Sequence, residues 1–295
     1  MSVPEEAGDA ADLAADLPAV LDRWVVAGTR RWIEAHQSRC GESAAAVHPF
    51  AGGFAFHAGV DSPLSKVVGC RSVVAAEELS ALARFYDQRG GGYDIELSAL
   101  ADRELRDQLE AAGYRRGVTE VALVRKNEAS RATALPLPEG IDAIERLLPS
   151  EGERAAQVLA AAAFAPDPPS AALLEVARTS LSQSDSVGWV AVAGGVDVAC
   201  ACHSIADENG VASLYGGATL PEWRGRGIQR ALIEARCADL RRSEARWVVV
   251  VTAAETTSFR NAERAGFRAS HAWELWRRAS GIVADDGEEP GASSL

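Results

Sequence analysis

The residues best suited to chemistry form a loop, Arg224-Gly225-Arg226-Gly227-Ile228-Gln229-Arg230, between a predicted strand and a predicted helix. Glycines let backbone N–H groups approach a ligand closely, and the first turn of a helix offers further free N–H groups and the positive end of its dipole. The arginines add positive charge, so the loop is typical of a phosphate or pyrophosphate site. It lacks the Gly-Lys-Ser/Thr ending of a Walker loop and the last glycine of the dinucleotide fingerprint. A basic turn without a ligand is the alternative interpretation.

An alternation of strands and helices in the C-terminal half positions this loop. Ser150 and Glu153 form a capping-box pattern that predicts a helix to about residue 163, and a second helix is predicted over 170–182. Three β-rich runs follow at 187–193, 196–205 and 211–219, separated by glycine-bearing hairpin signals. After the loop, the pattern predicts a helix over 228–242, an apolar strand over 247–252, a short helix over 258–265 and a strand over 269–276.

The N-terminal half ends with a similar series of elements. A strand over 93–97, a helix over 102–112 and a strand over 118–125 are predicted, with Gly113-Tyr114 between the last two. The C-terminal half ends in the same way around Gly266-Phe267, about half the chain further on. Glycine is a common helix C-cap, so coincidence is possible in principle, but the similar half-lengths favour a duplicated unit.

Charge and composition suggest the domain boundaries. The net charge is −12, and nine of the acidic groups lie in residues 1–20 and 279–295. We therefore expect two disordered acidic tails, 1–20 and 279–295, around a nearly neutral body. A polar segment with two prolines, 127–140, is the expected linker between domains at 21–126 and 141–278.

The same features disfavour several functional classes. A neutral body has no basic stripe for nucleic acid. The five scattered cysteines contain no CxxC pair, so neither a disulfide framework nor a zinc site is expected. No apolar run is long enough to span a membrane, and the acidic N-terminus is unlike a signal peptide, so we expect a cytoplasmic protein.

The order of motifs over about residues 140–278 resembles the GNAT acetyltransferase superfamily. The resemblance lies in the hairpin meander, the strand ending near Gly216-Gly217, the Arg224-x-x-Gly227 loop and helix, and the closing Gly266-Phe267. In that family, Arg/Gln-x-x-Gly-x-Gly/Ala holds the pyrophosphate of acetyl-CoA; here Gln229 replaces the final small residue. The N-terminal half has no such loop and looks like a degenerate copy. The resemblance thus implies an α/β (α+β) fold of tandem GNAT-like domains, each with a mixed, mostly antiparallel central sheet flanked by helices.

The resemblance also implies which residues bind the acyl donor. Acetyl-CoA is the expected donor, with no metal. Its pantetheine would lie along the strand before the loop, where backbone groups could also polarise the thioester carbonyl. The implied cofactor-binding residues are Gly217, Ala218, Thr219, Arg224, Gly225, Arg226, Gly227, Ile228, Gln229, Arg230 and Asn261.

The family's usual proton donor is missing. A tyrosine four residues before the closing glycine is expected, but Ala262 occupies that position. Ser258, one turn earlier, and Tyr215, on the strand leading to the acetyl site, are the candidate replacements. The alternatives are that Ser258 caps its helix and that Tyr215 packs in the core. His203 and Glu222 are the candidate bases; the alternatives are a structural histidine and a solvated glutamate.

The sequence therefore favours an N-acetyltransferase that transfers the acetyl group of acetyl-CoA to an amine by direct attack in a ternary complex. The amine would belong to a small molecule or a protein, and its identity is not encoded in any motif. A non-catalytic CoA-binding or scaffolding protein is the alternative. A nucleotide-phosphate binder is a weaker third interpretation, because the loop has no lysine.

Overall fold

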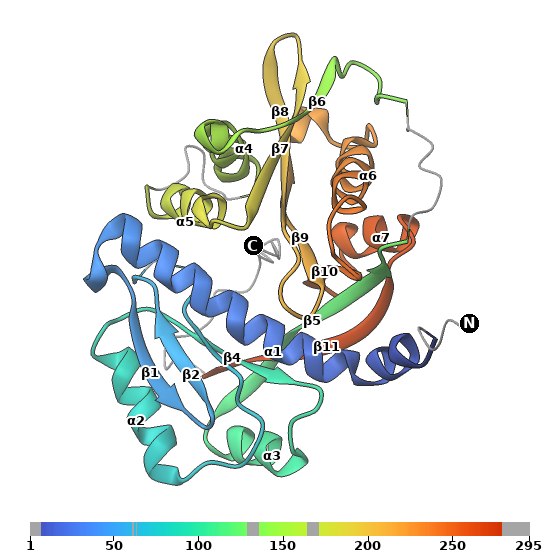
Figure 1. The fold of residues 1–295 in the computed structure, drawn as a ribbon. Helices are drawn as coiled ribbons and strands as arrows, with labels where there is room; N and C mark the ends of the chain where they lie inside the picture. Colours follow the sequence, from blue (N-terminus) through green and yellow to red (C-terminus); the bar gives the residue numbers. More distant parts are fainter. Residues whose placement is uncertain (1–6, 61, 63, 129–135, 164–170, 279–295) are drawn as a thin grey trace.

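The computed structural model describes residues 7–60, 62, 64–128, 136–163 and 171–278, which form one open sheet with helices on both faces (Figure 1). Short 3-10 helices lie at Glu42–Ala44, Pro149–Glu151 and Pro221–Trp223. The strands are β1 (Ala46–Phe50), β2 (Gly53–His57), β3 (Lys66–Val68), β4 (Asp94–Ser98), β5 (Tyr114–Lys126), β6 (Ala143–Arg146), β7 (Ser186–Ala193), β8 (Val196–Ser204), β9 (Val211–Thr219), β10 (Trp247–Ala253) and β11 (Arg268–Arg278). The helices are α1 (Ala7–Cys40), α2 (Ala76–Asp87), α3 (Arg103–Ala111), α4 (Gly152–Ala163), α5 (Ala171–Ser182), α6 (Ile228–Leu240) and α7 (Thr257–Arg264).

The strand order β1-β2-β3-β4-β11-β5-β10-β9-β8-β7-β6 is nearly symmetric about its centre. Each half contributes an antiparallel meander that ends in a parallel pair, β3 with β4 and β9 with β10. The closing strands are exchanged: β11 pairs with β4 of the N-terminal half, and β5 pairs with β10 of the C-terminal half. All other pairings are antiparallel, so the predicted mixed, mostly antiparallel sheet flanked by helices is confirmed.

Two layers of helices cover the sheet. On one face α1, α4 and α5 pack against residues such as Val68, Val190 and Val249. On the other face α2, α3, α6 and α7 pack against the alternate residues of the same strands, Ile95 and Val250 among them. Because side chains alternate along a strand, neighbouring residues face opposite layers wherever no bulge interrupts the strand.

The expectation of a disordered tail over residues 1–20 is wrong for its described part. Residues 7–40 form a single helix, α1, which lies across both halves of the sheet (Figure 1). Leu17, Val20 and Leu21 are buried at helical spacing and pack against Val249 and Trp273. The acidic residues in this segment suggested a solvated tail, but the apolar stripe decides its structure. The expected domain boundary at residue 21 thus falls inside a helix.

A buried carboxylate attaches α1 to the centre of the sheet. Asp22 accepts hydrogen bonds from Ser98 Oγ at 2.7 Å, His271 Nε2 at 2.8 Å and Trp273 Nε1 at 2.8 Å. Arg71 Nη2 lies 2.6 Å from the same carboxylate. These partners come from β4, β11 and the segment after β3, so one side chain links α1 to both halves.

The C-terminal end of α1 contacts α5. Trp32 Nε1 donates to Ser180 Oγ at 3.2 Å, and Arg39 Nε donates to Glu175 Oε1 at 2.8 Å. Because α5 belongs to the C-terminal half, α1 holds the two halves together near its middle, at Asp22, and at its C-terminal end.

The predicted elements of the C-terminal half agree closely with β7–β11 and α4–α7. The expected linker is attached at its start, because Asn127 Nδ2 donates to Leu240 O at 2.9 Å and to Ala245 O at 2.8 Å. The expected tail at 279–295 lies outside the described residues.

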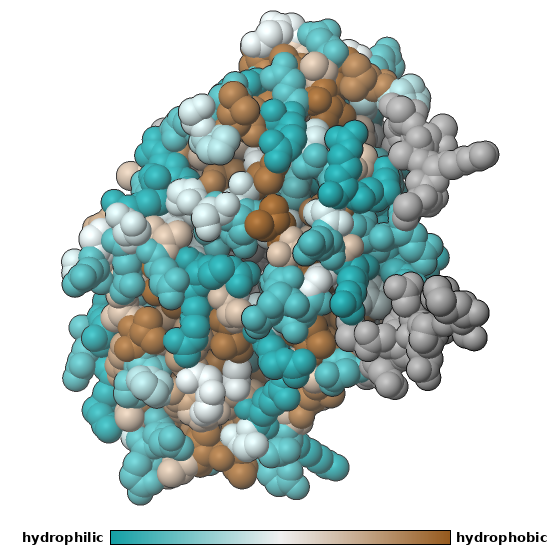
Figure 2. Space-filling model, in the orientation of Figure 1, coloured by the Kyte–Doolittle hydropathy of each residue, from teal (hydrophilic) through white to brown (hydrophobic). Residues whose placement is uncertain are grey.

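Among the helices that the structure describes, none has the length and apolarity to cross a membrane. Figure 2 shows a face on which hydrophilic residues predominate and hydrophobic ones are scattered among them.

Candidate functional site

The Arg224–Arg230 loop leads into α6 with an open helix N-terminus. Gly225 and Gly227 both have φ of +79°, a left-handed conformation that favours glycine. A Cβ atom added at either would meet no other atom within 4 Å, so the space beside the loop is free. Gly227 is the N-cap of α6 and supplies no side-chain hydrogen bond, so the first N–H groups of this helix are available to an anion.

The arginines of the loop have different roles. Arg224 Nε donates to Thr219 O at 3.1 Å and Arg224 Nη2 donates to Ala162 O at 2.9 Å, so this side chain ties the loop to β9 and α4. Arg226 lies over the ring of Trp223, 4.6 Å from its centroid, and is exposed like Arg230. The structure thus gives Arg224 a positioning role and leaves Arg226 and Arg230 as the exposed cations near the helix end.

Next to the loop, β9 and β10 separate. Their parallel pairing runs only from Val211 with Trp247 to Leu214 with Val250. Beyond that point β9 continues to Thr219 and β10 to Ala253, but the two strands no longer pair with each other. This leaves an opening between them in the middle of the sheet. The opening begins at Tyr215 on one strand and Val251 on the other.

A β-bulge shapes the β9 edge of this opening. The register with β8 passes from Tyr215 directly to Ala218, which places Gly216 and Gly217 outside the ladder. Bulges of this kind release backbone groups from sheet pairing and are common beside active sites. A Cβ atom at Gly217 would lie 2.9 Å from Gln229 Oε1, so a larger residue there would displace the Gln229 amide.

Gln229 fixes the strand to the helix. Its Nε2 donates to Ala218 O at 2.9 Å and to Thr219 Oγ1 at 3.0 Å. The residue that departs from the family pattern therefore holds β9 against α6. Ala218 and Thr219 are buried, whereas Gly217 is exposed.

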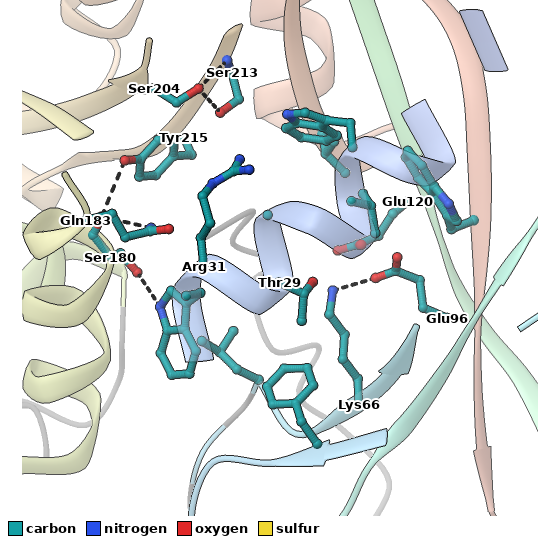
Figure 3. A pocket seen from close by; sticks show the side chains of 18 of the residues that line it. Thr29, Arg31, Lys66, Glu96, Glu120, Ser180, Gln183, Ser204, Ser213 and Tyr215 are labelled. Atoms are coloured by element: carbon teal, nitrogen blue, oxygen red, sulfur yellow. Dashed lines mark hydrogen bonds and ion pairs between the residues drawn. The ribbon is translucent and has the colours of Figure 1, made fainter. Parts of the chain in front are cut away.

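A cavity of about 250 Å³ lies behind the opening, between α1, α5 and the sheet (Figure 3). Tyr215 and Val251, the first residues of the opening, both line it. Its walls come from both halves of the chain, with α1 as one side. Its principal residues are Trp24, Arg31, Trp32, Phe56, Lys66, Asp94, Glu96, Glu120, Asp185, Tyr215, Val251 and Trp273.

Tyr215 is held on the cavity wall by hydrogen bonds. Its hydroxyl donates to Ser186 Oγ at 2.5 Å and lies 3.3 Å from Ser180 O. Burial raises the pKa of this phenol far above its usual value, so it stays protonated at all physiological pH. Tyr215 therefore lines the cavity and is tied to its wall by these hydrogen bonds; its role as a proton donor stays a prediction.

The two bases expected from the sequence lie away from the cavity lining. His203 is buried, with Nδ1 accepting from Trp189 Nε1 at 3.1 Å and Nε2 3.5 Å from Asp239 Oδ2. Burial lowers the pKa of this imidazole to about 4, which keeps it neutral. Its contacts support the structural alternative. Glu222 is exposed in the 3-10 helix before the loop.

The residues expected on α7 are also outside the cavity lining. Ser258 is exposed and is not the helix cap, because Thr256 Oγ1 accepts from Phe259 N at 3.2 Å. Asn261 is half-buried on the same helix, and its Oδ1 accepts from Arg264 Nη1 at 3.3 Å. Ala262, at the position of the family tyrosine, is fully buried in the core.

The charged residues of the cavity were missed by sequence reasoning. Lys66 forms an ion pair with Glu96, and the tips of Lys66, Glu96 and Glu120 point toward one another in Figure 3. Arg31 Nε lies 3.4 Å from Asp185 Oδ2 at another part of the cavity. The available signal was a carboxylate inside an apolar strand, as in the segment Val118–Val124 around Glu120.

A family comparison agrees with this geometry. Residues 153–267, from the start of α4 to the residue before β11, match the family model described as the Acetyltransferase (GNAT) family. The C-terminal half contains this match to the GNAT family and is called the GNAT domain below. The matched segment contains the separated strands, the bulge and the loop.

Solved structures extend the likeness across both halves. A GCN5-related N-acetyltransferase from Kribbella flavida superposes with a TM-score of 0.58 at 17% identity, covering 86% of this chain and 97% of that one. A tandem GNAT protein from the clavulanic acid biosynthesis pathway gives 0.57 at 14% identity, covering 85% and 89%. A GCN5-related N-acetyltransferase from Sphaerobacter thermophilus gives 0.53 at 22%, covering 70% and 67%. No curated protein matches the chain. These structures show that the likeness in fold extends over both halves, as expected for a tandem GNAT-like arrangement.

The two ends of the sheet differ in their suitability for phosphate. In the GNAT domain, α6 begins with the glycine loop and has no acidic residue in its first turn. The corresponding helix of the N-terminal half, α2, has Glu77 and Glu78 there, and Glu78 Oε2 already accepts from Ala75 N at 3.1 Å. Negative charge at a helix N-terminus repels a phosphate and neutralises the dipole.

Proposed function

We propose that this protein is an acetyl-CoA-dependent N-acetyltransferase in which the GNAT domain binds the donor and the cavity between the halves receives the acceptor amine. One observation carries the proposal: the opening between β9 and β10 begins at Tyr215 and Val251, which also line the cavity. The same strand, β9, ends at Thr219 and leads through the glycine loop to the N-terminus of α6. A thioester that enters the opening from the loop therefore meets an amine that enters from the cavity.

The residues of the GNAT domain fit a coenzyme A pyrophosphate and pantetheine. Free N–H groups at Gly225–Ile228 suit the phosphates, and the exposed Arg226 and Arg230 add positive charge. The bulge at Gly216 and Gly217 supplies backbone groups outside the ladder for the pantetheine and for the thioester carbonyl. Donors aimed at the developing oxyanion are worth roughly 3 kcal/mol each.

Direct transfer needs few side chains. The neutral amine attacks the thioester carbon and the C–S bond breaks, and one of the two protons of the amine nitrogen passes to the thiolate. A thiol has a pKa of about 8.5, so it leaves without a strong acid. This agrees with the buried Ala262 at the position of the family tyrosine.

One coenzyme A molecule is expected per chain. Among the described residues, an Arg-x-x-Gly sequence leads into a helix N-terminus only in the GNAT domain, because Arg89–Gly92 of the N-terminal half follows α2 and precedes β4. At the N-terminus of α2, where a second pyrophosphate would bind, the chain has Glu77 and Glu78. Calorimetric titration with acetyl-CoA measures the stoichiometry, and a thiol-release assay against a panel of amines measures turnover. Two equivalent sites would contradict the division between the halves. Binding without turnover on any amine would leave the scaffolding alternative in place of the enzyme.

Removal of either candidate proton donor is expected to have a small effect. Tyr215→Phe keeps the ring in the cavity wall and loses the bond to Ser186, while Ser258→Ala changes an exposed side chain. We expect each to lower turnover less than tenfold and to leave the KM for acetyl-CoA nearly unchanged. Steady-state kinetics decide this, because a true general acid is worth about 10²–10⁴-fold. A hundredfold loss with coenzyme A binding intact would assign the donor role to that residue.

A further inference from the structure

Glu120 is a carboxylate on the cavity wall that forms no direct ion pair with a described residue. Across the described residues, no ion pair or hydrogen bond joins its carboxylate to another group, although it lines the cavity beside the Lys66–Glu96 pair. The other carboxylates of the cavity are compensated: Asp94 by Arg277, and Asp185 by Arg31. The cavity thus holds one carboxyl group more than its direct ion pairs account for, since the neighbouring Lys66 is paired with Glu96.

The register of the sheet places Glu120 close to the opening. Glu120 pairs with Ala253 of β10, and Ala122 pairs with Val251, the residue at the opening. Directly opposed residues of an antiparallel pair share a face, so Glu120 and Val251 lie on the same side of the sheet. Two residues along a strand span roughly 7 Å, which is the reach of a side chain and a bound amine.

The remaining walls are mostly aromatic. Trp24, Trp32, Phe56 and Trp273 surround the cavity together with aliphatic residues of α1, β10 and β11. Aromatic faces attract organic cations and bury apolar groups. A volume of about 250 Å³ is below the usual 300–1,000 Å³ range of ligand pockets, so the cavity suits a small molecule.

We propose that Glu120 binds the acceptor amine as a cation and accepts its proton, and that the acceptor is a small primary amine with one positive charge and an aromatic or branched apolar body. The proposal rests on the acetyltransferase function above. It places the acceptor-binding carboxylate on β5, a strand of the N-terminal half that lies inside the sheet of the GNAT domain.

The proton balance of the reaction is complete with this residue. The ammonium group gives one proton to the Glu120 carboxylate, and the resulting neutral amine attacks the thioester carbon. As the C–N bond forms and the C–S bond breaks, the second proton of nitrogen goes to the thiolate. Glu120 then returns its proton to solvent through the cavity.

The surroundings of Glu120 suit proton transfer from an amine. Burial raises the pKa of this carboxyl, which brings its proton affinity closer to that of an amine. Lys66 of β3 opposes the shift, while Glu96 and Asp94 of β4 reinforce it. Across the cavity the charged residue of α1 is Arg31, and the neighbours of Glu120 on β10 and β11 are the uncharged Ala253 and Trp273.

A panel of acceptors tests the substrate class with the full-length protein and acetyl-CoA. Phenethylamine represents the proposed class, spermidine a polyamine, kanamycin an aminoglycoside, and a lysine-containing peptide a protein acceptor. We expect kcat/KM for phenethylamine to exceed each of the others at least tenfold. Equal or better use of spermidine, kanamycin or the peptide would overturn the proposed class.

The role of Glu120 is tested by Glu120→Gln, which keeps the shape of the side chain and removes its charge. We expect kcat/KM for the amine to fall about 100-fold, and the rise of kcat/KM with pH through the raised pKa of Glu120 to disappear. Glu120→Asp should recover part of the rate and keep the pH limb. Glu34→Gln, which removes the same charge from the exposed side of α1, should change neither.

Acetyl-CoA titration separates the two proposals. Glu120→Gln should bind acetyl-CoA like the wild type, because the residue lies on the acceptor side of the opening. An unchanged rate and pH profile in Glu120→Gln, with acetyl-CoA bound and turned over, would overturn the role of Glu120 alone. Failure of the wild-type protein to bind acetyl-CoA would reject the acetyltransferase function itself.

Discussion

Gly227→Val is expected to weaken acetyl-CoA binding tenfold or more while the protein stays folded. Gly227 has φ of +79° at the N-cap of α6, a conformation that a β-branched residue adopts only with strain. The substitution would turn the first N–H groups of the helix and place two methyl groups in the free space beside the loop. Tenfold corresponds to about 1.4 kcal/mol, which the loss of one or two phosphate hydrogen bonds supplies. Calorimetric titration measures the affinity.

The chain offers a matched control for this substitution. Gly195, in the hairpin between β7 and β8, has φ of +78° and free space around its Cβ position. Gly195→Val therefore imposes the same backbone strain away from the loop. It should lower the melting temperature about as much as Gly227→Val and leave the dissociation constant of acetyl-CoA unchanged. Equal affinities in the two variants would remove the loop from the donor site.

Asp22→Ala is expected to destabilise the folded state by about 3 kcal/mol. The change leaves the donors of Ser98, His271 and Trp273 without their acceptor in a buried setting, and it removes the partner of Arg71. Loss of a buried hydrogen-bonded charge typically costs 3–5 kcal/mol, and the partly exposed Arg71 reduces the effect. Urea unfolding followed by circular dichroism measures the difference.

Asp16→Ala is the comparison on the same helix. Asp16 is exposed, and its ion pair with Arg23 spans 3.6 Å at the surface. Exposed pairs contribute little, so the free energy of unfolding should change by less than about 0.5 kcal/mol. Similar losses for the two variants would mean that the buried network does not hold α1 in place.

The contribution of Asp22 also depends on pH. Burial alone would raise the pKa of this carboxyl, but the hydrogen bonds from His271 and Ser98 and the charge of Arg71 lower it below its usual value. A carboxyl with a lowered pKa in the folded state stabilises the fold above its unfolded pKa of about 3.9. That stabilisation is lost as the pH falls through the folded pKa. The difference between wild type and Asp22→Ala should therefore shrink below about pH 4.

Much of the C-terminal half could be predicted, because its hydrophobic periodicity and its turn and cap residues indicate the same helices and strands. The strand predicted at 211–219 coincides with β9, and the helix and strand after the loop follow from their periodicity. The N-terminal half was harder. Strands β1–β3 are three to five residues long, too short for a clear alternation. The first part of α1 combines acidic and small residues, and its helical structure is stabilised by contacts with strands far away in the sequence.

The loop could be predicted, but the cavity could not. The residues of the loop are contiguous in the sequence, and its glycines indicate a left-handed backbone conformation. The cavity collects side chains from α1, α5 and strands of both halves, and only the strand order brings them together. Glu120 illustrates why the cavity could not be predicted from the sequence. Its partner in the sheet is Ala253, and no local sequence pattern relates the two residues. His203 was a candidate because of its residue type, and its burial with Trp189 shows that type alone does not identify a base.

The exchanged central strands determine when the protein can finish folding during its synthesis. Among the strands that the structure describes, β11 is synthesised last, yet it fills the position between β4 and β5, both made much earlier. Until it arrives, the N-terminal half has two exposed strand edges where its sheet should be continuous. The centre of the sheet is therefore completed only after β11 has been made, and until then the exposed edges of β4 and β5 can pair with another chain. A truncation that removes only β11 would leave the sheet incomplete between the two halves. From the cavity lining it would delete only Trp273 and Leu275.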